Sequence, residues 1–328
     1  MLTGLHTNWL DGINYQEDRD YLLKVAENNQ LRRGENVAAN LRPQFDGSNS
    51  IAIGYGLDLL VNSDATIDRY LTNAGLATLT SADKTLLSDA RAKRKASIAA
   101  GTNISSDLRT IASQLSLMLP SEQKASDILR NIANEKESAL VVDLMAAGMP
   151  TADIVALENT REFAVLVSLK YNGAMGPNVI NAIKNGDRAE AWYEIRYNAS
   201  KSGGVVVGGL AKRRFFEADY FGLYSEGVIS TNMSDAEAKG AFRTFTRHRD
   251  AIKSYEATWG VSVDGVPGSR GNYITQANTD YGVGLVGTLE QDLTPANIYL
   301  IKTYVTDEGI TTTIDWRNIQ VGEDQSTL

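Results

Sequence analysis

The sequence contains no cysteine and only two histidines, His6 and His248. The absence of cysteine excludes disulfide bonds, thiol nucleophiles and zinc sites built from thiolates. His248 lies in the charged helical stretch TRHRDAIKSYEA, and both histidines are expected on the surface. A catalytic triad or a metal cluster that depends on histidine is therefore not predicted.

The sequence also lacks a long apolar run and an excess of basic residues. Its longest apolar runs, such as FAVLVSL at 163–169, are far shorter than the roughly 18 residues that cross a bilayer. The first residues show no secretion signal, so a target outside the cell would require delivery by another system. The net charge of −8 argues against sequence-independent binding of nucleic acid, because phosphate contacts need clustered lysine and arginine.

The first 225 residues are predicted to be mainly helical with a small β element. Apolar residues at helical spacing in 18–29 predict a short helix that carries Glu27 at its C-terminal end. SIAIGYG at 50–56 alternates in the manner of a strand or hairpin. From Ile67 to about residue 200 the apolar residues recur at periods of three and four, which predicts a series of helices.

The sequence changes character after about residue 224. Residues 233–260 predict one long polar helix. NIYLIKTYV at 297–305 and GITTTIDW at 309–316 predict two strands joined by the turn TDEG. We therefore place a domain boundary near 226–232.

Most common catalytic motifs are absent. The chain has no glycine-rich phosphate loop and no GxSxG motif. Gly54 and Gly56 could begin a dinucleotide fingerprint, but Leu59 occupies the place of the third glycine. Carboxylates remain as the candidates for chemistry.

Three acidic residues are candidates for cleavage of a glycosidic bond, with surface acids at a helix end and at two turns as the alternative interpretation. That reaction uses one protonated carboxyl group on the leaving oxygen and one ionised carboxylate opposite it. Glu27, beside Leu23 and Val25 at a helix end, is expected to be partly desolvated, which favours the protonated form of a carboxyl group. Asp46 and Asp58 bracket a polar hairpin whose glycines permit close approach of a sugar, and both are expected to stay ionised.

Five segments of the chain, in this order, resemble the phage-type lysozymes, the muramidases of glycoside hydrolase family 24, and most closely their pesticin-like branch. The resemblance runs discontinuously over roughly residues 18–224. The segments are YLLKVAEN, FDGSNSIAIGYGLDL, REFAVLVSLKYNGAMG, AIKNGDRAEAWYEI and GGLAKRRFFEADYF. The resemblance implies that Glu27 is the catalytic glutamate that ends the first helix. Asp46 matches the phage-type position of the second carboxylate and Asp58 the pesticin-type position.

The sequence departs from the family pattern in three places. Ala52 stands where the family usually has Thr or Ser, so the hydroxyl that helps to hold the attacking water is missing, and Ser50 or backbone groups would have to substitute. The connection from Glu27 to the strand is longer than in the phage enzymes, which favours Asp58 over Asp46. Residues 61–119 hold more helix than a minimal phage lysozyme and are interpreted as a helical insertion.

Other residues are candidates for contact with the glycan. The amide of Asn172 can both donate to and accept from an acetamido group. Tyr55, Tyr171 and Trp192 offer faces for stacking on sugars, although core packing is the commoner fate of such rings. A structural ion pair is expected among Arg213, Arg214 and Glu217.

The sequence thus predicts an α+β, mainly helical, lysozyme-like fold with a small β-hairpin lobe over residues 1–225. A C-terminal accessory region would occupy 226–328. The resemblance implies hydrolysis of the β-1,4 bond between N-acetylmuramic acid and N-acetylglucosamine in peptidoglycan, with inverting geometry and no metal or organic cofactor. Glu27 would donate the proton, and Asp58 or Asp46 would orient or deprotonate water.

Two alternatives to a muramidase remain open. The first is a lytic transglycosylase that uses Glu27 alone, and the second is a non-catalytic wall-binding or virion structural protein on the same scaffold. The expected partner is the glycan strand of bacterial peptidoglycan. A phage endolysin, a virion-associated lysin and an antibacterial toxin with an immunity protein fit these residues equally. Each would be made in the cytoplasm and act in the periplasm or cell wall, or in a virion.

Overall fold

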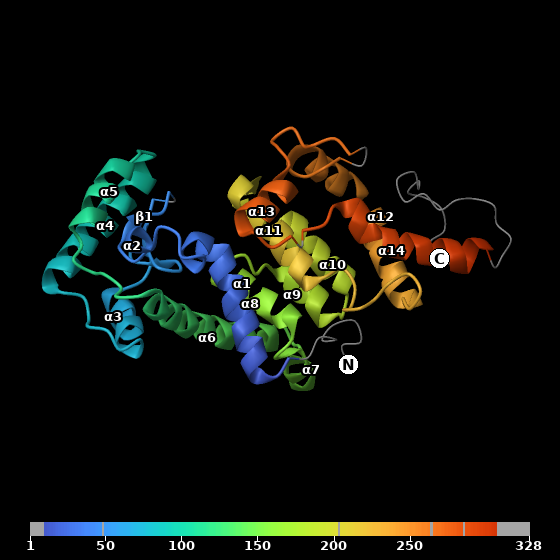
Figure 1. Cartoon of the computed structure of the whole chain (residues 1–328), viewed down its shortest axis with the longest axis horizontal. Coiled ribbons are helices and arrows are strands. Elements are labelled where there is room, and N and C mark those ends of the chain that lie inside the picture. Colours follow the sequence, from blue (N-terminus) through green and yellow to red (C-terminus); the bar gives the residue numbers. More distant parts are fainter. Residues whose placement is uncertain (1–9, 48, 203, 263–264, 285, 307–328) are drawn as a thin grey trace. The chain divides into compact units, whose positions relative to one another are not determined.

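The structure is a computed structural model that describes residues 10–306 except 48, 203, 263–264 and 285. The described part is mainly helical with a small antiparallel sheet, which confirms the α+β class (Figure 1). The chain divides into two compact units. We call residues 20–138 the hairpin unit, and residues 1–19 with 139–328 the helical unit. The boundaries fall inside helices α1 (Gly12–Arg32) and α6 (Glu122–Ala146).

The hairpin unit contains a three-stranded antiparallel sheet. Its strands, in spatial order, are β1 (Gln44–Phe45), β2 (Ile51–Ile53) and β3 (Leu57–Asp58). Ala52 pairs with Gln44 on one side and with Asp58 on the other. Because directly paired residues point to the same face of a sheet, these three side chains share a face. Ile51 and Ile53 point to the other face and are buried, so the strand predicted at 50–56 has one core-facing side.

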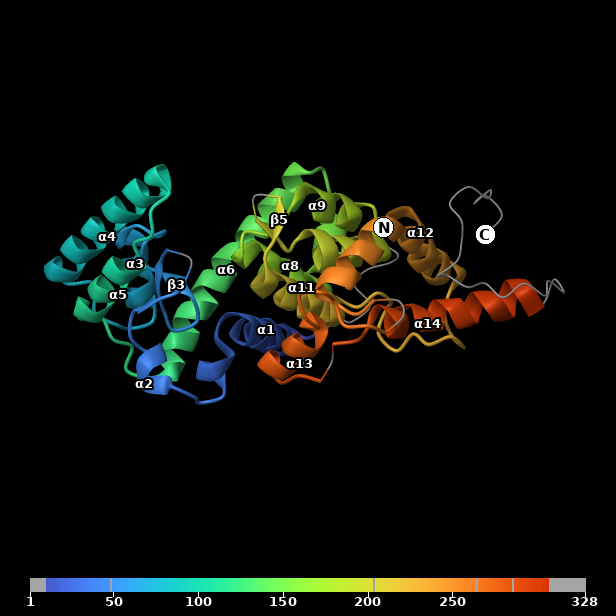
Figure 2. The same cartoon turned by 90° about the horizontal axis from the view of Figure 1, so that it is seen from above.

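Helices fill the rest of the hairpin unit, and polar caps begin several of them. The helices that lie wholly in this unit are α2 (Val37–Asn40), α3 (Asp64–Asn73), α4 (Ser81–Ala100) and α5 (Ser105–Gln114). Thr80 and Asp83 form a capping box at the start of α4, and the Ser121 hydroxyl accepts from the Lys124 amide at the start of α6. Helices α4 and α5 run alongside each other (Figure 2). The helical character predicted for 61–119 is confirmed.

The helical unit is built around α8. Its elements are α7 (Thr151–Leu157), α8 (Arg161–Tyr171), α9 (Pro177–Lys184), α10 (Arg188–Tyr193), the π-helix η1 (Glu194–Asn198), the hairpin strands β4 (Lys201–Ser202) and β5 (Val205–Val206), α11 (Gly208–Phe221), α12 (Asp235–Trp259), α13 (Tyr273–Tyr281), α14 (Leu289–Leu300) and the π-helix η2 (Ile301–Thr306). Every residue of 163–169 in α8 is buried. The longest apolar run of the chain is therefore a core helix, which buries all of its faces.

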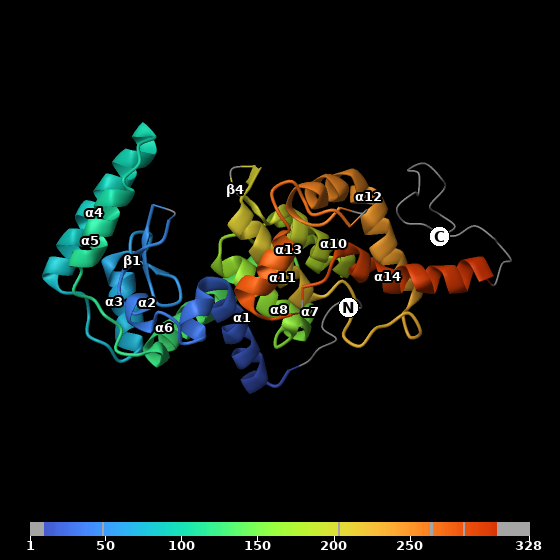
Figure 3. The ribbon, with the colours of Figure 1, turned by 45° about the horizontal axis from the view of Figure 1, so that its top comes forward.

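The boundary predicted near 226–232 does not divide the structure. Helix α13 packs against α11, and α12 packs against α10 and α14 (Figure 3), so the residues after 226 belong to the same unit as 139–225. The buried Arg196 of η1 also holds this packing, because it pairs with Glu256 of α12 at 3.4 Å and with Asp292 of α14 at 2.8 Å. The change in composition at 224 is therefore not a domain boundary, because the core continues across it.

The prediction for the C-terminal residues was right for one element and wrong for another. The long polar helix is α12, which begins at a capping box formed by Ser234 and Glu237. The strand predicted at 297–305 is helical, in α14 and η2. A second capping box at Thr288 starts α14, and the packing of α14 on α12 outweighs the strand preference of its isoleucines and tyrosines. The strand predicted at 309–316 and His6 lie outside the described residues.

Candidate active site

Helix α1 breaks immediately after Glu27. Asn28 has φ −155° and ψ 76°, outside the helical region, and a second helical segment continues to Arg32. Glu27 is therefore the last residue of the first segment, as the sequence predicts. Leu23 and Val25 are buried beside it, while Glu27 itself is half-buried.

The Glu27 carboxyl lies against the turn between β2 and β3. A β-carbon built at Gly56 would lie 3.0 Å from Glu27 Oε2 and 3.7 Å from its Cδ. Gly56 also has φ +87°, a conformation that side chains rarely adopt. Two independent demands thus call for glycine here: the left-handed backbone and the close approach of the acid.

Asp58 follows Gly56 by two residues, and one of its oxygens is fixed. Oδ1 accepts from the Ser50 hydroxyl at 2.5 Å and from the amides of Leu60 at 2.7 Å and Val61 at 2.9 Å. Among the described residues, Oδ2 has no hydrogen-bond donor. Since two residues of chain span at most about 7 Å, the Glu27 carboxyl lies within roughly 12 Å of the Asp58 α-carbon. The pair thus meets the first requirement for joint action, which is proximity within one compact unit.

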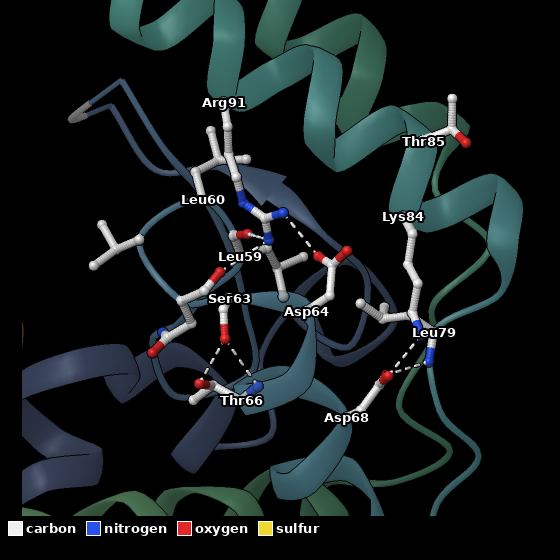
Figure 4. Close-up of polar contacts among 12 residues, drawn as sticks. Leu59, Leu60, Ser63, Asp64, Thr66, Asp68, Leu79, Lys84, Thr85 and Arg91 are labelled. Atoms are coloured by element: carbon white, nitrogen blue, oxygen red, sulfur yellow. Dashed lines mark hydrogen bonds and ion pairs between the residues drawn. The ribbon is translucent and has the colours of Figure 1, made fainter.

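The loop after Asp58 is held by Arg91 of α4 (Figure 4). Its Nη2 donates to the carbonyl oxygens of Leu59 and Asn62, each at 2.9 Å, and its Nη1 pairs with Asp64 at 2.7 Å. The Asn62 amide in turn donates to the Asp58 carbonyl at 2.7 Å. Helix α4 therefore supports the loop that fixes the Asp58 carboxylate.

Asp46 has a different setting from Asp58. It is exposed in the turn between β1 and β2, where its Oδ1 accepts from the Ser50 amide at 3.1 Å. A carboxylate that closes its own turn in this way is typical of turn structure. Of the two aspartates left open by the sequence, Asp58 is the one whose carboxylate is fixed by three donors, two residues after the Gly56 that Glu27 contacts.

Ser50 and Ala52 occupy different environments on the sheet. Ala52 is half-buried on the face that carries Asp58, so the missing hydroxyl leaves only a methyl group there. Ser50 is fully buried, and its hydroxyl donates to Asp58. Ser50 therefore orients the carboxylate and does not present its hydroxyl at a sugar-facing surface.

Tyr55 and Trp192 are core residues, which corrects their interpretation as stacking faces. Tyr55 is 2% exposed, and its hydroxyl donates to Glu122 Oε1 at 2.7 Å. Burial raises the pKa of Tyr55, with a further contribution from Glu122. Trp192 is 3% exposed, with Arg196 against its ring. The sequence shows which residues are aromatic, but it does not show whether tertiary packing covers their rings.

Glu122 is a carboxylate that the sequence did not single out. Tyr55, Ser126 and Lys24 all donate to its Oε1, at 2.7, 2.7 and 3.1 Å. Burial alone raises the pKa of Glu122, but these three donors outweigh it and hold the pKa below its usual range. Glu122 therefore anchors the tyrosine between the two glycines of the turn. No local pattern indicates this, because its partners lie on three different elements.

Asn172 and Tyr171 belong to the helical unit and end α8 there. Asn172 is exposed, and its Oδ1 accepts from Arg214. Tyr171 is half-buried. The acetamido contact expected of Asn172 would thus use its amide nitrogen, since the oxygen is engaged.

The ion pair predicted among Arg213, Arg214 and Glu217 is confirmed. Glu217 is fully buried, accepts from Arg213 Nε and the Ser168 hydroxyl at 2.8 and 2.6 Å, and pairs with Arg214. Burial alone raises the pKa of Glu217, but the guanidinium groups of Arg214 and Arg213 outweigh it and lower the pKa. These residues fasten α11 to α8 and are structural.

His248 is half-buried, which differs from the surface position expected. Its ring stacks on Tyr193 with 3.7 Å between centroids, and its Nε2 lies 2.7 Å from Glu190. In the part of the chain that the structure describes, no group of three or more His, Asp or Glu side chains is arranged to hold a metal ion. None of the described helices has the length and apolar character to cross a membrane.

Comparison with protein-family models, curated proteins and solved structures gives no match to this chain. The resemblance to the phage-type lysozymes therefore stays a prediction from the five sequence segments.

Proposed function

We propose that the chain is a peptidoglycan hydrolase, a muramidase that cleaves the β-1,4 bond between N-acetylmuramic acid and N-acetylglucosamine. The observation that carries the proposal is the contact of the Glu27 carboxyl with Gly56, two residues before the oriented carboxylate of Asp58. A lysozyme-like fold, with the sheet as its hairpin lobe, is part of the same proposal. The small sheet and the helix that ends at Glu27 support it.

Each carboxylate has a distinct role in this mechanism. Glu27, half-buried beside Leu23 and Val25, protonates the leaving oxygen of the glycosidic bond. Asp58 uses Oδ2 to take a proton from the attacking water, because Oδ1 is occupied by its three donors. Inverting hydrolysis places the two carboxyl groups roughly 6.5–9.5 Å apart, a spacing compatible with a Glu27 carboxyl that lies within roughly 12 Å of the Asp58 α-carbon.

The biological setting follows from the substrate. A muramidase acts on the cell wall, so this chain would reach peptidoglycan as a phage lysin, a virion component or a toxin, delivered by another system. The net charge of −8 predicts weak electrostatic attraction to anionic walls, so the affinity would come from contacts along the glycan.

A lytic transglycosylase is the second candidate, and the surroundings of Asp58 supply the reason for it. Ala52 supplies no hydroxyl and Ser50 donates to Asp58, so neither side chain is placed to hold a water molecule. An enzyme that used Glu27 alone would let the sugar's own hydroxyl attack in place of water.

The products of digestion separate these possibilities. We expect purified sacculi treated with the protein to release muropeptides with reducing ends, identified by mass spectrometry. Products with 1,6-anhydro ends would replace the hydrolase with the transglycosylase. Binding to sacculi without any soluble product would favour the non-catalytic alternative.

The fit between Glu27 and the turn predicts unequal effects of two glycine substitutions. Gly56→Ala is expected to strain the turn by about 1–3 kcal/mol and to displace the Glu27 carboxyl, with a large loss of lytic rate. Gly101→Ala is the matched control, since Gly101 in the same unit also has positive φ, but its added carbon would meet no atom within 4 Å. Urea unfolding and release of dye from labelled sacculi measure both variants. Equal losses of rate at equal stability would contradict the contact with Glu27.

A further inference from the structure

Asn28 connects the break in α1 to the turn that Glu27 contacts. Its Nδ2 donates to the Gly54 carbonyl at 3.0 Å and to Asn40 Oδ1 at 3.2 Å. The Gly54 amide in turn donates to the Asn40 carbonyl at 3.0 Å. One side-chain amide thus ties the end of the first helical segment to the first glycine of the turn.

The side-chain oxygen of Asn28 caps the start of the second helical segment. Asn28 Oδ1 accepts from the Leu31 amide at 3.1 Å, three residues ahead, which is the bond made by a helix N-cap. The backbone of Asn28 has left the helix, as an N-cap residue does. Both polar groups of the side chain are therefore engaged, and both stabilise the interruption of helix α1 at Asn28.

Two consecutive residues of α1 meet the two glycines that flank Tyr55. Glu27 lies against Gly56, and Asn28 donates to Gly54. We infer that Asn28 is a positioning residue, which fixes the Glu27 carboxyl against the turn and so in register with Asp58. This inference rests on the proposed function for its catalytic meaning, while the positioning itself is a property of the hairpin unit alone.

The chemistry of asparagine is specific to this role. Aspartate would keep the acceptor for the Leu31 amide, but it would set a carboxylate against the Gly54 carbonyl and Asn40 Oδ1, where a donor is required. Glycine would tolerate the backbone break and supply neither bond. The two variants Asn28→Asp and Asn28→Gly therefore separate the cap from the tie to the turn.

The kinetic test compares both variants with the parent on sacculi over a range of concentrations. We expect the maximal rate to fall roughly 10- to 100-fold, because a small displacement of a catalytic group costs about this much, with little change in the concentration that gives half the maximal rate. Asp68→Asn is the control: Asp68 pairs with Lys84 at 2.7 Å and accepts from the Leu79 amide (Figure 4), so its loss weakens the same unit through contacts that involve neither Glu27 nor Asn28. A rate loss in Asp68→Asn as large as in the Asn28 variants would reduce Asn28 to a stability role.

A second measurement needs no activity. The Gly56 amide resonance is expected to shift strongly when Glu27→Gln is introduced into the parent, and to shift much less in an Asn28→Gly background, where the carboxyl is no longer held against the turn. Equal shifts in the two backgrounds would overturn the inference. If the parent releases no muropeptides, the proposed function fails, whereas this comparison still decides whether Asn28 positions Glu27.

Discussion

Replacing Glu27 with glutamine is expected to lower the release of muropeptides from sacculi by roughly 10²- to 10⁴-fold, the usual contribution of a general acid. Glutamine has the size of glutamate and keeps its contact with Gly56, so the fold and stability should be close to those of the parent. Because only the acidic proton is removed, the loss reports the chemistry. Circular dichroism and the initial rate of dye release check the two parts of the prediction.

The two aspartates provide the matched comparison for Glu27. Asp58→Asn keeps an oxygen for the Ser50 hydroxyl and the two amides but removes the base, so we expect a strong loss of hydrolysis. Asp46→Asn should stay near the parent rate, because Asp46 closes an exposed turn. Full activity of Glu27→Gln would reject the mechanism. Full activity of Asp58→Asn together with 1,6-anhydro products would identify the transglycosylase.

The helical unit is expected to become more stable when Asp219 is replaced with asparagine, and the gain should depend on pH. Burial, followed by the negative charge of Asp292, raises the pKa of Asp219 to about 7. The two carboxylates meet at Gly287, whose amide donates to Asp219 at 3.2 Å and whose α-carbon lies beside Asp292 Oδ1. One guanidinium, that of Arg196, serves both Asp292 and Glu256, so the cluster holds more acids than bases.

The sign of the pH dependence follows from proton binding. The unfolded chain loses the Asp219 proton near pH 3.8, whereas the folded chain keeps it until about pH 7. The folded state binds more protons in this window, so Asp219 lowers the free energy of unfolding as the pH rises toward 7 and adds no further change above it. The gain from Asp219→Asn should therefore be larger at pH 8 than at pH 5 by on the order of 2–3 kcal/mol.

Tryptophan fluorescence during urea unfolding measures the gain in stability of the helical unit. Residues 20–138 contain no tryptophan, while the helical unit contains Trp192 and Trp259. Asp280→Asn is the control, because Asp280 is largely exposed and pairs with Lys212. A gain that is the same at pH 5 and pH 8, or one matched by Asp280→Asn, would show that Asp219 does not titrate as described.

The side chains around the site show where prediction from sequence stops. Tyr55 and Ser50 flank strand β2 in the alternating segment 50–56, and this pattern is equally compatible with exposed or covered positions. Their burial depends on Glu122 and Asp58, which lie 67 and 8 residues away along the chain. The strand predicted at 297–305 was wrong for a related reason. Its isoleucines and tyrosines prefer strands weakly, and this preference is overridden by contacts with α12.

The sequence alone determined the features that depend on neighbours within one or two helical turns. These are the mainly helical class, the long polar helix α12 and the end of the first helical segment at Glu27. The tertiary structure decided which aspartate is oriented, which rings are covered and where the chain divides into units. Helix ends and helical periodicity depend on residues three or four positions apart. The orientation of Asp58, the burial of Tyr55 and the ion pairs of Arg196 need partners that only folding brings together.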